Sequence, residues 1–248
     1  MFSRGNISEK IRFGKLVCED EMVLDMYAGI GYYTLPALIH GNAKYVYACE
    51  WNKHAADALR YNLSQNQLND RATIFVGDCR ESLRKHEVLK IGFDRVSLGL
   101  LPSSEGGWST AVQAINCDKG GWLHVHGNVP TVERQTWGLW LCQRILELRD
   151  DWGGDKVKDH VVVCQHIERV KSFAPKIAHY VADVFLGPKK RLCLELPGIR
   201  MNGNRSGICE KGEFFPVVGI VSSPSCALGE NSILHQKWMR NEKNEGDN

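Results

Sequence analysis

The fold is decided by residues 23–33, which read VLDMYAGIGYY. An apolar run is followed by a Gly-x-Gly turn at Gly29 and Gly31, and then by residues that suit a helix. Glycine lets a ligand approach the backbone closely, and the free N–H groups at the start of a helix attract a carboxylate or a phosphate. The stretch therefore predicts a ligand-binding turn between a buried strand and a helix.

Around this turn the sequence alternates short apolar runs with helical stretches, which is the pattern of a parallel sheet covered by helices on both faces. We therefore expect a doubly wound, mostly parallel, Rossmann-like α/β sheet over residues 21–186. From Gly187 onward, glycine, proline, serine, asparagine and charged residues dominate, which predicts an irregular or disordered tail over 187–248. Strands are expected at 22–26, 45–49, 72–76, 94–101, 122–126, 160–166 and 180–186, the last of them antiparallel at the sheet edge; helices are expected at 32–40, 54–66, 109–116 and from 130 to about 150.

Composition narrows the class of protein. The 248 residues are 43% hydrophobic and 24% charged with a formal net charge of +2, which fits a globular chain and does not by itself indicate nucleic-acid binding. No run of about 18 apolar residues occurs, so a membrane partner is not expected. The nine cysteines are scattered without a Cys-x-x-Cys pair, which favours a reducing compartment, the cytoplasm, over a disulfide or zinc framework.

Two acids follow at the ends of the next two predicted strands. Glu50 ends the second strand about 20 residues after the turn. At this position doubly wound folds have an acidic residue that accepts hydrogen bonds from ribose hydroxyls. Asp78 follows the third strand, where a carboxylate can accept a hydrogen bond from the amino group of adenine. The alternative is that both acids only cap helices and the glycines only close a turn. Thr34 stands where the dinucleotide motif has its third glycine, which argues against NAD. With Asp25 before the turn, the pattern resembles the class I S-adenosylmethionine-dependent methyltransferases. This resemblance implies that Asp25, Gly29 and Gly31 are among the cofactor-binding residues.

Longer motifs narrow the resemblance within that superfamily. Over roughly residues 1–186 the chain resembles the tRNA wybutosine-synthesizing protein 2 family. The motifs that carry this resemblance occur in order: MFSRGN at 1–6, EK at 9–10, DMYAGIGY at 25–32, ACEWN at 48–52, GLLPSSE at 99–105, GGWLHVHGN at 120–128 and VKSFAP at 170–175.

The resemblance implies an enzyme that transfers the 3-amino-3-carboxypropyl group of S-adenosylmethionine to 4-demethylwyosine at position 37 of tRNA(Phe), releasing methylthioadenosine. It places Ser3 and Lys10 near the amino-acid portion of the cofactor and Glu50 on the ribose. It places Asp78 and Cys79 at the adenine, with Cys79 standing where an Asn is expected. It also implies that residues 1–20 contact the cofactor, and that an upstream tRNA-binding region typical of the family is absent here.

Two alternatives stay open. A tRNA guanine(37)-N1 methyltransferase would share the cofactor crevice, although the GLLP sequence at 99–102 differs from the Asn-Leu-Pro-like residues of that branch. A truncated, non-catalytic cofactor-binding form is the other. No general base is assigned, because neither Glu105 nor His126 is singled out by the sequence.

Several other polar and aromatic residues lie near predicted strand ends. His124 and His126 share one face of a strand, but no third ligand follows at a familiar spacing, so we expect them to line the substrate pocket rather than to bind a metal. Of Trp51, Trp108 and Trp122, at most one is expected to stack against a flat base.

Overall fold

The computed structural model describes residues 6–196, 199, 201, 203–210 and 213–217. These residues form a nine-stranded sheet with the order β3-β2-β1-β4-β5-β7-β6-β8-β9. The strands are β1 (Met22–Asp25), β2 (Tyr45–Glu50), β3 (Ala72–Val76), β4 (Arg95–Leu98), β5 (Gly121–Pro130), β6 (His160–Ala174), β7 (Ile177–Pro188), β8 (Ser206–Glu210) and β9 (Glu213–Pro216). The helices are α1 (Ile7–Leu16), α2 (Thr34–Ile39), α3 (Lys53–Gln65), α4 (Cys79–Lys85), α5 (Trp108–Ala114), α6 (Arg134–Gly153) and α7 (Lys189–Glu195).

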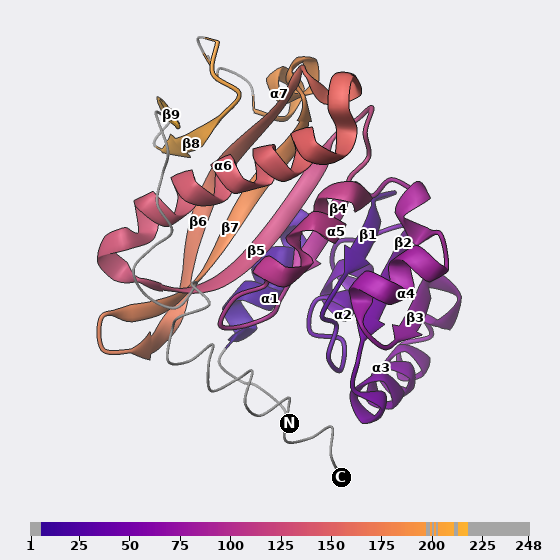
Figure 1. The fold of residues 1–248 in the computed structure, drawn as a ribbon. Coiled ribbons are helices and arrows are strands. Elements are labelled where there is room, and N and C mark those ends of the chain that lie inside the picture. Colours follow the sequence, from indigo (N-terminus) through magenta and orange to yellow (C-terminus); the bar gives the residue numbers. More distant parts are fainter. Residues whose placement is uncertain (1–5, 197–198, 200, 202, 211–212, 218–248) are drawn as a thin grey trace, which may run out of the picture.

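Helices cover both faces of the sheet, as predicted. Figure 1 shows α4, α5 and α6 in front of the strands and α1 and α2 behind them. A large apolar cluster under the front helices is centred on buried side chains such as Trp108, Trp137 and Leu141. A second cluster, on the other face, joins Phe13 of α1 to Leu38 of α2 and further residues of α3. The prediction of a doubly wound α/β fold is confirmed.

The strands β3, β2, β1, β4 and β5 are parallel, so their carboxyl ends meet at one edge of the sheet. The place of β7 differs from the sequence prediction, because it lies between β5 and β6, antiparallel to both, and not at the sheet edge. Its residues after Ile177 are all buried, as expected for a strand with a neighbour on each side. Lys176, with a φ of +63°, lies in the tight turn that returns the chain from β6 into β7.

The predicted irregular tail also requires correction within the described residues. α7 packs on the sheet, β8 pairs in parallel with β6, and β9 pairs antiparallel with β8. Ile208 is buried, and a Cβ added to Gly138 of α6 would lie 3.3 Å from its Cγ2, so β8 packs closely against α6. Residues 218–248 lie outside the described part of the chain.

Within the ranges given above, the structure contains no helix with the length and apolar character that a bilayer crossing requires.

Candidate functional site

The glycine turn follows β1 directly and needs glycine at both positions. Gly29 has a φ of +57° and Gly31 a φ of +105°, in the region that disfavours side chains. A Cβ on Gly31 would lie 2.9 Å from Leu59 Cδ1 of α3. The turn is therefore packed against α3. Because glycine has no side chain, the backbone at Gly29 and Gly31 is not covered by these residues.

Glu50 ends β2 beside this turn and binds it through the backbone. Its Oε2 accepts a hydrogen bond from Gly29 N (2.7 Å), and its Oε1 accepts one from Asn52 N (2.8 Å). Asn52 in turn caps α3, because its Oδ1 accepts from the N–H groups of His54 and Ala55. Each carboxylate oxygen can accept a second hydrogen bond, so Glu50 still has capacity for a ligand hydroxyl. The structure brings the turn and Glu50 together as the sequence predicted.

Asp25 supports the turn from below. It is fully buried, and its Oδ2 accepts a hydrogen bond from Thr34 Oγ1 (2.8 Å). Burial raises the pKa of Asp25 to about 6, against the lowering effect of that hydrogen bond. The threonine in place of the third motif glycine is thus explained: its hydroxyl is the partner of Asp25. Asp25 therefore supports the turn and does not face solvent.

Asp78 follows β3 and caps α4, as in the alternative interpretation of its role. Its Oδ1 accepts from Arg80 N (2.8 Å), and its carboxylate pairs with the Arg80 guanidinium. The hydrogen bond from the Arg80 side chain is the main reason why the pKa of Asp78 lies below its usual value. Cys79 is 6% exposed, and burial raises the pKa of its thiol to about 11. A ligand contact at Cys79 would therefore be made by its backbone N–H and not by its thiol.

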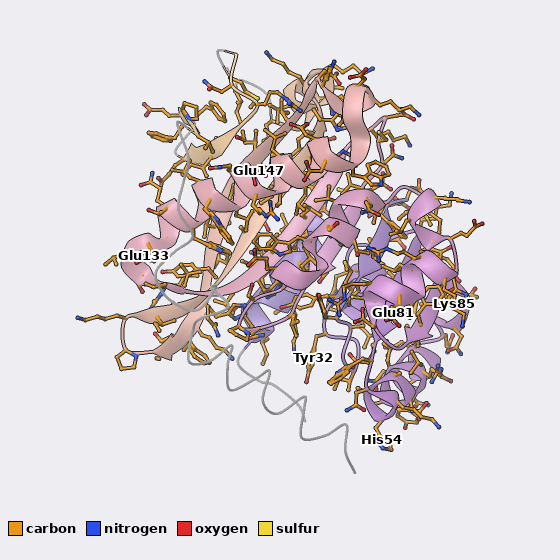
Figure 2. The ribbon with its side chains drawn as sticks, viewed as in Figure 1. Tyr32, His54, Glu81, Lys85, Glu133 and Glu147 are labelled. Carbon is orange, nitrogen blue, oxygen red and sulfur yellow. The ribbon has the colours of Figure 1, made fainter. Side chains whose placement is uncertain are left out.

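Lys10 reaches the glycine turn from α1. Its Nζ lies 4.1 Å from the centre of the Tyr32 ring, and Tyr32 directly follows Gly31. Partial burial lowers the pKa of Lys10. Figure 2 shows Tyr32 and His54 toward the same lower edge of the molecule, which is the edge where β2 leads into α3. Ser3, the other residue predicted here, lies outside the described residues.

The two histidines of β5 do not line an open pocket, which corrects the expectation for them. His124 is 1% exposed and His126 is 2% exposed. His124 lies between Arg95 and Asp183, and His126 Nδ1 lies 3.0 Å from His179 Nε2. Among the side chains that the structure describes, no group of three or more His, Cys, Asp or Glu has the arrangement of a metal site.

The three tryptophans singled out from the sequence have different surroundings. Trp108 is buried and donates its indole N–H to Ser104 Oγ (3.0 Å), and Trp122 packs against Phe185. Trp51, the residue after Glu50, is 67% exposed. Of the three, Trp51 is therefore the one whose ring is exposed beside the end of β2.

A surface depression of about 270 Å³ lies elsewhere, between β6, β8 and the start of α6. Its lining includes Arg134, His166 and Glu210, and it shares no residue with the glycine turn or with Glu50. Sequence reasoning did not identify this depression, nor the buried partners of His124. Both depend on residues far apart in the sequence, so no local motif indicates them.

The chain is similar to known proteins in both sequence and fold. Residues 1–136 match the TRM5/TYW2 methyltransferase domain. The chain is 47% identical over 184 residues to the tRNA wybutosine-synthesizing protein 2/3/4 of Arabidopsis thaliana, covering 74% of this chain and 18% of that protein. It is 38% identical over 232 residues to the Homo sapiens tRNA wybutosine-synthesizing protein 2 homolog, covering 74% of this chain and 50% of that protein. The chain thus spans half or less of the length of these relatives.

Two solved structures have the same fold. M. jannaschii TYW2 in complex with AdoMet has a TM-score of 0.61 and 27% identity, covering 76% of this chain and 78% of that one. WT Trm5b from Pyrococcus abyssi has a TM-score of 0.62 and 27% identity, covering 75% of this chain and 50% of that one. With more than half of its residues matched by the family description, the chain belongs to the TRM5/TYW2 methyltransferase domain family.

Proposed function

We propose that this chain is the catalytic part of an S-adenosylmethionine-dependent transferase that places a 3-amino-3-carboxypropyl group on 4-demethylwyosine at position 37 of tRNA(Phe), in wybutosine biosynthesis. The observation that carries the proposal is the match over 74% of the chain to relatives named for wybutosine synthesis. The family match over residues 1–136 contains the glycine turn and Glu50. Residues 21–186 are assigned to the cofactor-binding catalytic domain and residues 1–20 to a segment that contacts the cofactor. The scattered cysteines favour the cytoplasm.

Related structures support S-adenosylmethionine as the cofactor of this chain. M. jannaschii TYW2 is described in complex with AdoMet, and P. horikoshii TYW2 in complex with MeSAdo, at 27% and 25% identity. MeSAdo is what remains of S-adenosylmethionine after the aminocarboxypropyl group has left. In this chain Glu50 would accept hydrogen bonds from the ribose, and the backbone at Gly29 and Gly31 would lie close to the cofactor. Asp78 and the Cys79 N–H would meet the adenine, and Lys10 and Ser3 the amino-acid end.

Orientation decides which group is transferred. Bound S-adenosylmethionine supplies a sulfonium that activates all three attached carbons, so the carbon held in line with the nucleophile reacts. Lys10, whose ammonium lies at the glycine turn, would pair with the carboxylate of the amino-acid end. That pairing would hold the γ-carbon of the aminocarboxypropyl group toward the substrate base.

The alternative function is tRNA guanine(37)-N1 methylation, and the similarity to Trm5b keeps it testable. Aligned on Leu101-Pro102, Leu100 stands where that branch has an Asn after the fourth strand. An aliphatic side chain supplies no carboxamide to hold a target amino or ring nitrogen. This residue favours a carbon nucleophile and aminocarboxypropyl transfer.

The test uses S-adenosylmethionine labelled differently in its methyl and carboxyl carbons, together with tRNA(Phe) that carries 4-demethylwyosine. Carboxyl label in the tRNA with release of methylthioadenosine is the expected result. Methyl label with release of S-adenosylhomocysteine would establish the methyltransferase instead. Glu50→Ala should abolish both cofactor binding and label transfer, and a tRNA(Phe) carrying unmodified guanine serves as the substrate control.

A further inference from the structure

A line of hydrogen-bonded ionisable residues crosses the sheet face that α1 covers. On the sheet, the Arg95 guanidinium donates two hydrogen bonds to the Glu21 carboxylate, at 2.7 and 2.8 Å. Its Nη1 lies 2.7 Å from His124 Nε2, and His124 Nδ1 lies 2.7 Å from Asp183 Oδ1. The line thus runs from β4 through β5 to β7, three neighbouring strands.

The hydrogen bonds fix the protonation of His124. An arginine guanidinium only donates, so His124 Nε2 must accept from Arg95. The ring proton is then on Nδ1, which donates to Asp183. Burial lowers the pKa of His124, which agrees with a neutral ring. His124 therefore orients the Asp183 carboxylate without neutralising it.

Asp183 continues the line into α1. Arg12 of α1 donates to Asp183 Oδ2 (2.5 Å) and Oδ1 (3.1 Å), and it also donates to both oxygens of the Glu9 carboxylate at 2.7 and 2.8 Å. The neighbouring His124 and Arg12 hold the pKa of Asp183 well below its usual range, against the effect of its burial. One carboxylate on the sheet thus holds the guanidinium of the helix.

Burying this line of charged residues costs desolvation free energy, which attachment of a helix by apolar packing would not require. The side chains of Glu9, Asp183, His124 and Arg95 are 0%, 5%, 1% and 5% exposed. Well-packed apolar residues attach a helix at least as strongly as a buried ion pair, whereas a directed ion pair fixes one placement. Phe13 already supplies an apolar anchor on the same helix. The charged line therefore adds a defined position rather than simple adhesion.

The position that it defines is that of Lys10. Lys10 lies on α1 between Glu9 and Arg12, and its Nζ is 4.1 Å from the centre of the Tyr32 ring at the glycine turn. We propose that Asp183, oriented by His124, is a positioning residue that acts through Arg12 to hold α1, so that Lys10 stands ready for the carboxylate of S-adenosylmethionine. This inference rests on the proposed function.

The first experiment separates the amino-acid end of the ligand from its adenosine end. S-adenosylmethionine and methylthioadenosine, which lacks the amino-acid end, are titrated by calorimetry into Asp183→Asn. We expect about a tenfold loss of affinity for S-adenosylmethionine, the scale of one charge-assisted contact, and little change for methylthioadenosine. The matched control is Asp150→Asn on α6, which removes a carboxylate paired with Arg205 at 2.7 and 3.0 Å. It should change neither affinity.

A double-mutant cycle tests the route through Lys10. If Asp183 acts by placing Lys10, then Asp183→Asn adds little to the loss already caused by Lys10→Ala. Additive losses, equal losses for both ligands, or an unchanged affinity for S-adenosylmethionine would each overturn the proposal. Should Asp183→Asn fail to fold, Arg12→Gln replaces it, because Arg12 is partly exposed and its loss leaves Asp183 bonded to His124.

A last measurement is independent of the cofactor. Hydrogen exchange of the backbone amides of α1 in the ligand-free protein should be faster in Asp183→Asn than in the wild type, and unchanged in Asp150→Asn. Unchanged exchange in Asp183→Asn would overturn the proposal even if the cofactor binds. A wild-type protein that binds neither ligand would instead refute the proposed function, while the exchange result still decides whether Asp183 holds α1.

Discussion

Glu50 closes the glycine turn through its carboxylate, and under the proposed function the same carboxylate would accept hydrogen bonds from the cofactor ribose. We expect Glu50→Ala to lower the free energy of unfolding of the ligand-free protein by about 2–4 kcal/mol, because it removes two hydrogen bonds from backbone N–H groups to a charged acceptor. Chemical unfolding followed by circular dichroism measures this. Asp78→Ala is the control, with an expected loss of about 1 kcal/mol for a more exposed helix cap. Equal stability of Glu50→Ala and the wild type would show that the turn does not depend on Glu50.

Gly31 allows a second prediction at the residue scale. Gly31→Ala should cost about 2–4 kcal/mol, since it combines a positive φ with a Cβ 2.9 Å from Leu59 Cδ1 in the core. Gly203→Ala is the matched control, because Gly203 also has a positive φ (+88°) but has no atom within 4 Å of the added Cβ. Its expected cost is about 1 kcal/mol, from backbone strain alone. Unfolding midpoints in urea compare the two, and equal losses would show that crowding at the turn is unimportant.

What the sequence predicts at this scale depends on sequence distance. Gly29, Gly31 and Glu50 are recognisable because a strand, a turn and the next strand repeat a short local pattern. Arg12 and Asp183 are 171 positions apart and carry no such pattern. Their contact exists only because β7 lies beside β5 in the sheet, and this placement is determined by tertiary packing. Asp78 shows a different limit, because its local sequence suits both a helix cap and a ligand contact and does not distinguish between them.

At the scale of elements, the prediction from composition was wrong for the C-terminal strands β8 and β9, which it assigned to an irregular tail. Residues from Gly187 onward are rich in turn formers, yet β8 and β9 extend the sheet beside β6. Each has only four or five residues, too few for a periodic apolar pattern. β8 is stabilised by pairing with β6 and by packing of Ile208 on α6, and β9 is stabilised by pairing with β8. None of these contributions is visible in the local sequence.

This packing can be tested with one side chain. Ile208→Ala should lower the free energy of unfolding by about 2–4 kcal/mol, because Ile208 is 4% exposed within the main apolar cluster. Phe215 of the neighbouring strand β9 is 38% exposed and serves as the control. Phe215→Ala should cost less than about 1 kcal/mol. If the two variants lost the same small amount, β8 would contribute little to the stability of the folded sheet.

At the scale of the whole molecule, buried histidines make the fold sensitive to acid. Burial lowers the pKa of His160 and of His179 to about 4, and it also lowers the pKa of His124 and His126. The unfolded chain protonates these rings near pH 6.5. Their contribution to stability is therefore complete above pH 6.5 and is lost as the pH falls from 6.5 toward 4.

Two buried acids oppose this trend. The pKa of Asp25 is raised to about 6 and that of Glu9 is raised as well, in both cases chiefly by burial, so protonation of these groups favours the folded state as the pH falls. The four histidines outnumber the two acids, so unfolding should take up protons in net, and the free energy of unfolding should fall as the pH is lowered from 6.5 toward 5. Urea unfolding at a series of pH values measures it. His179→Asn should flatten the dependence on pH, because burial lowers the pKa of His179 to about 4 in the folded state. A stability that stays constant from pH 7 to 5 would contradict this account of the buried histidines.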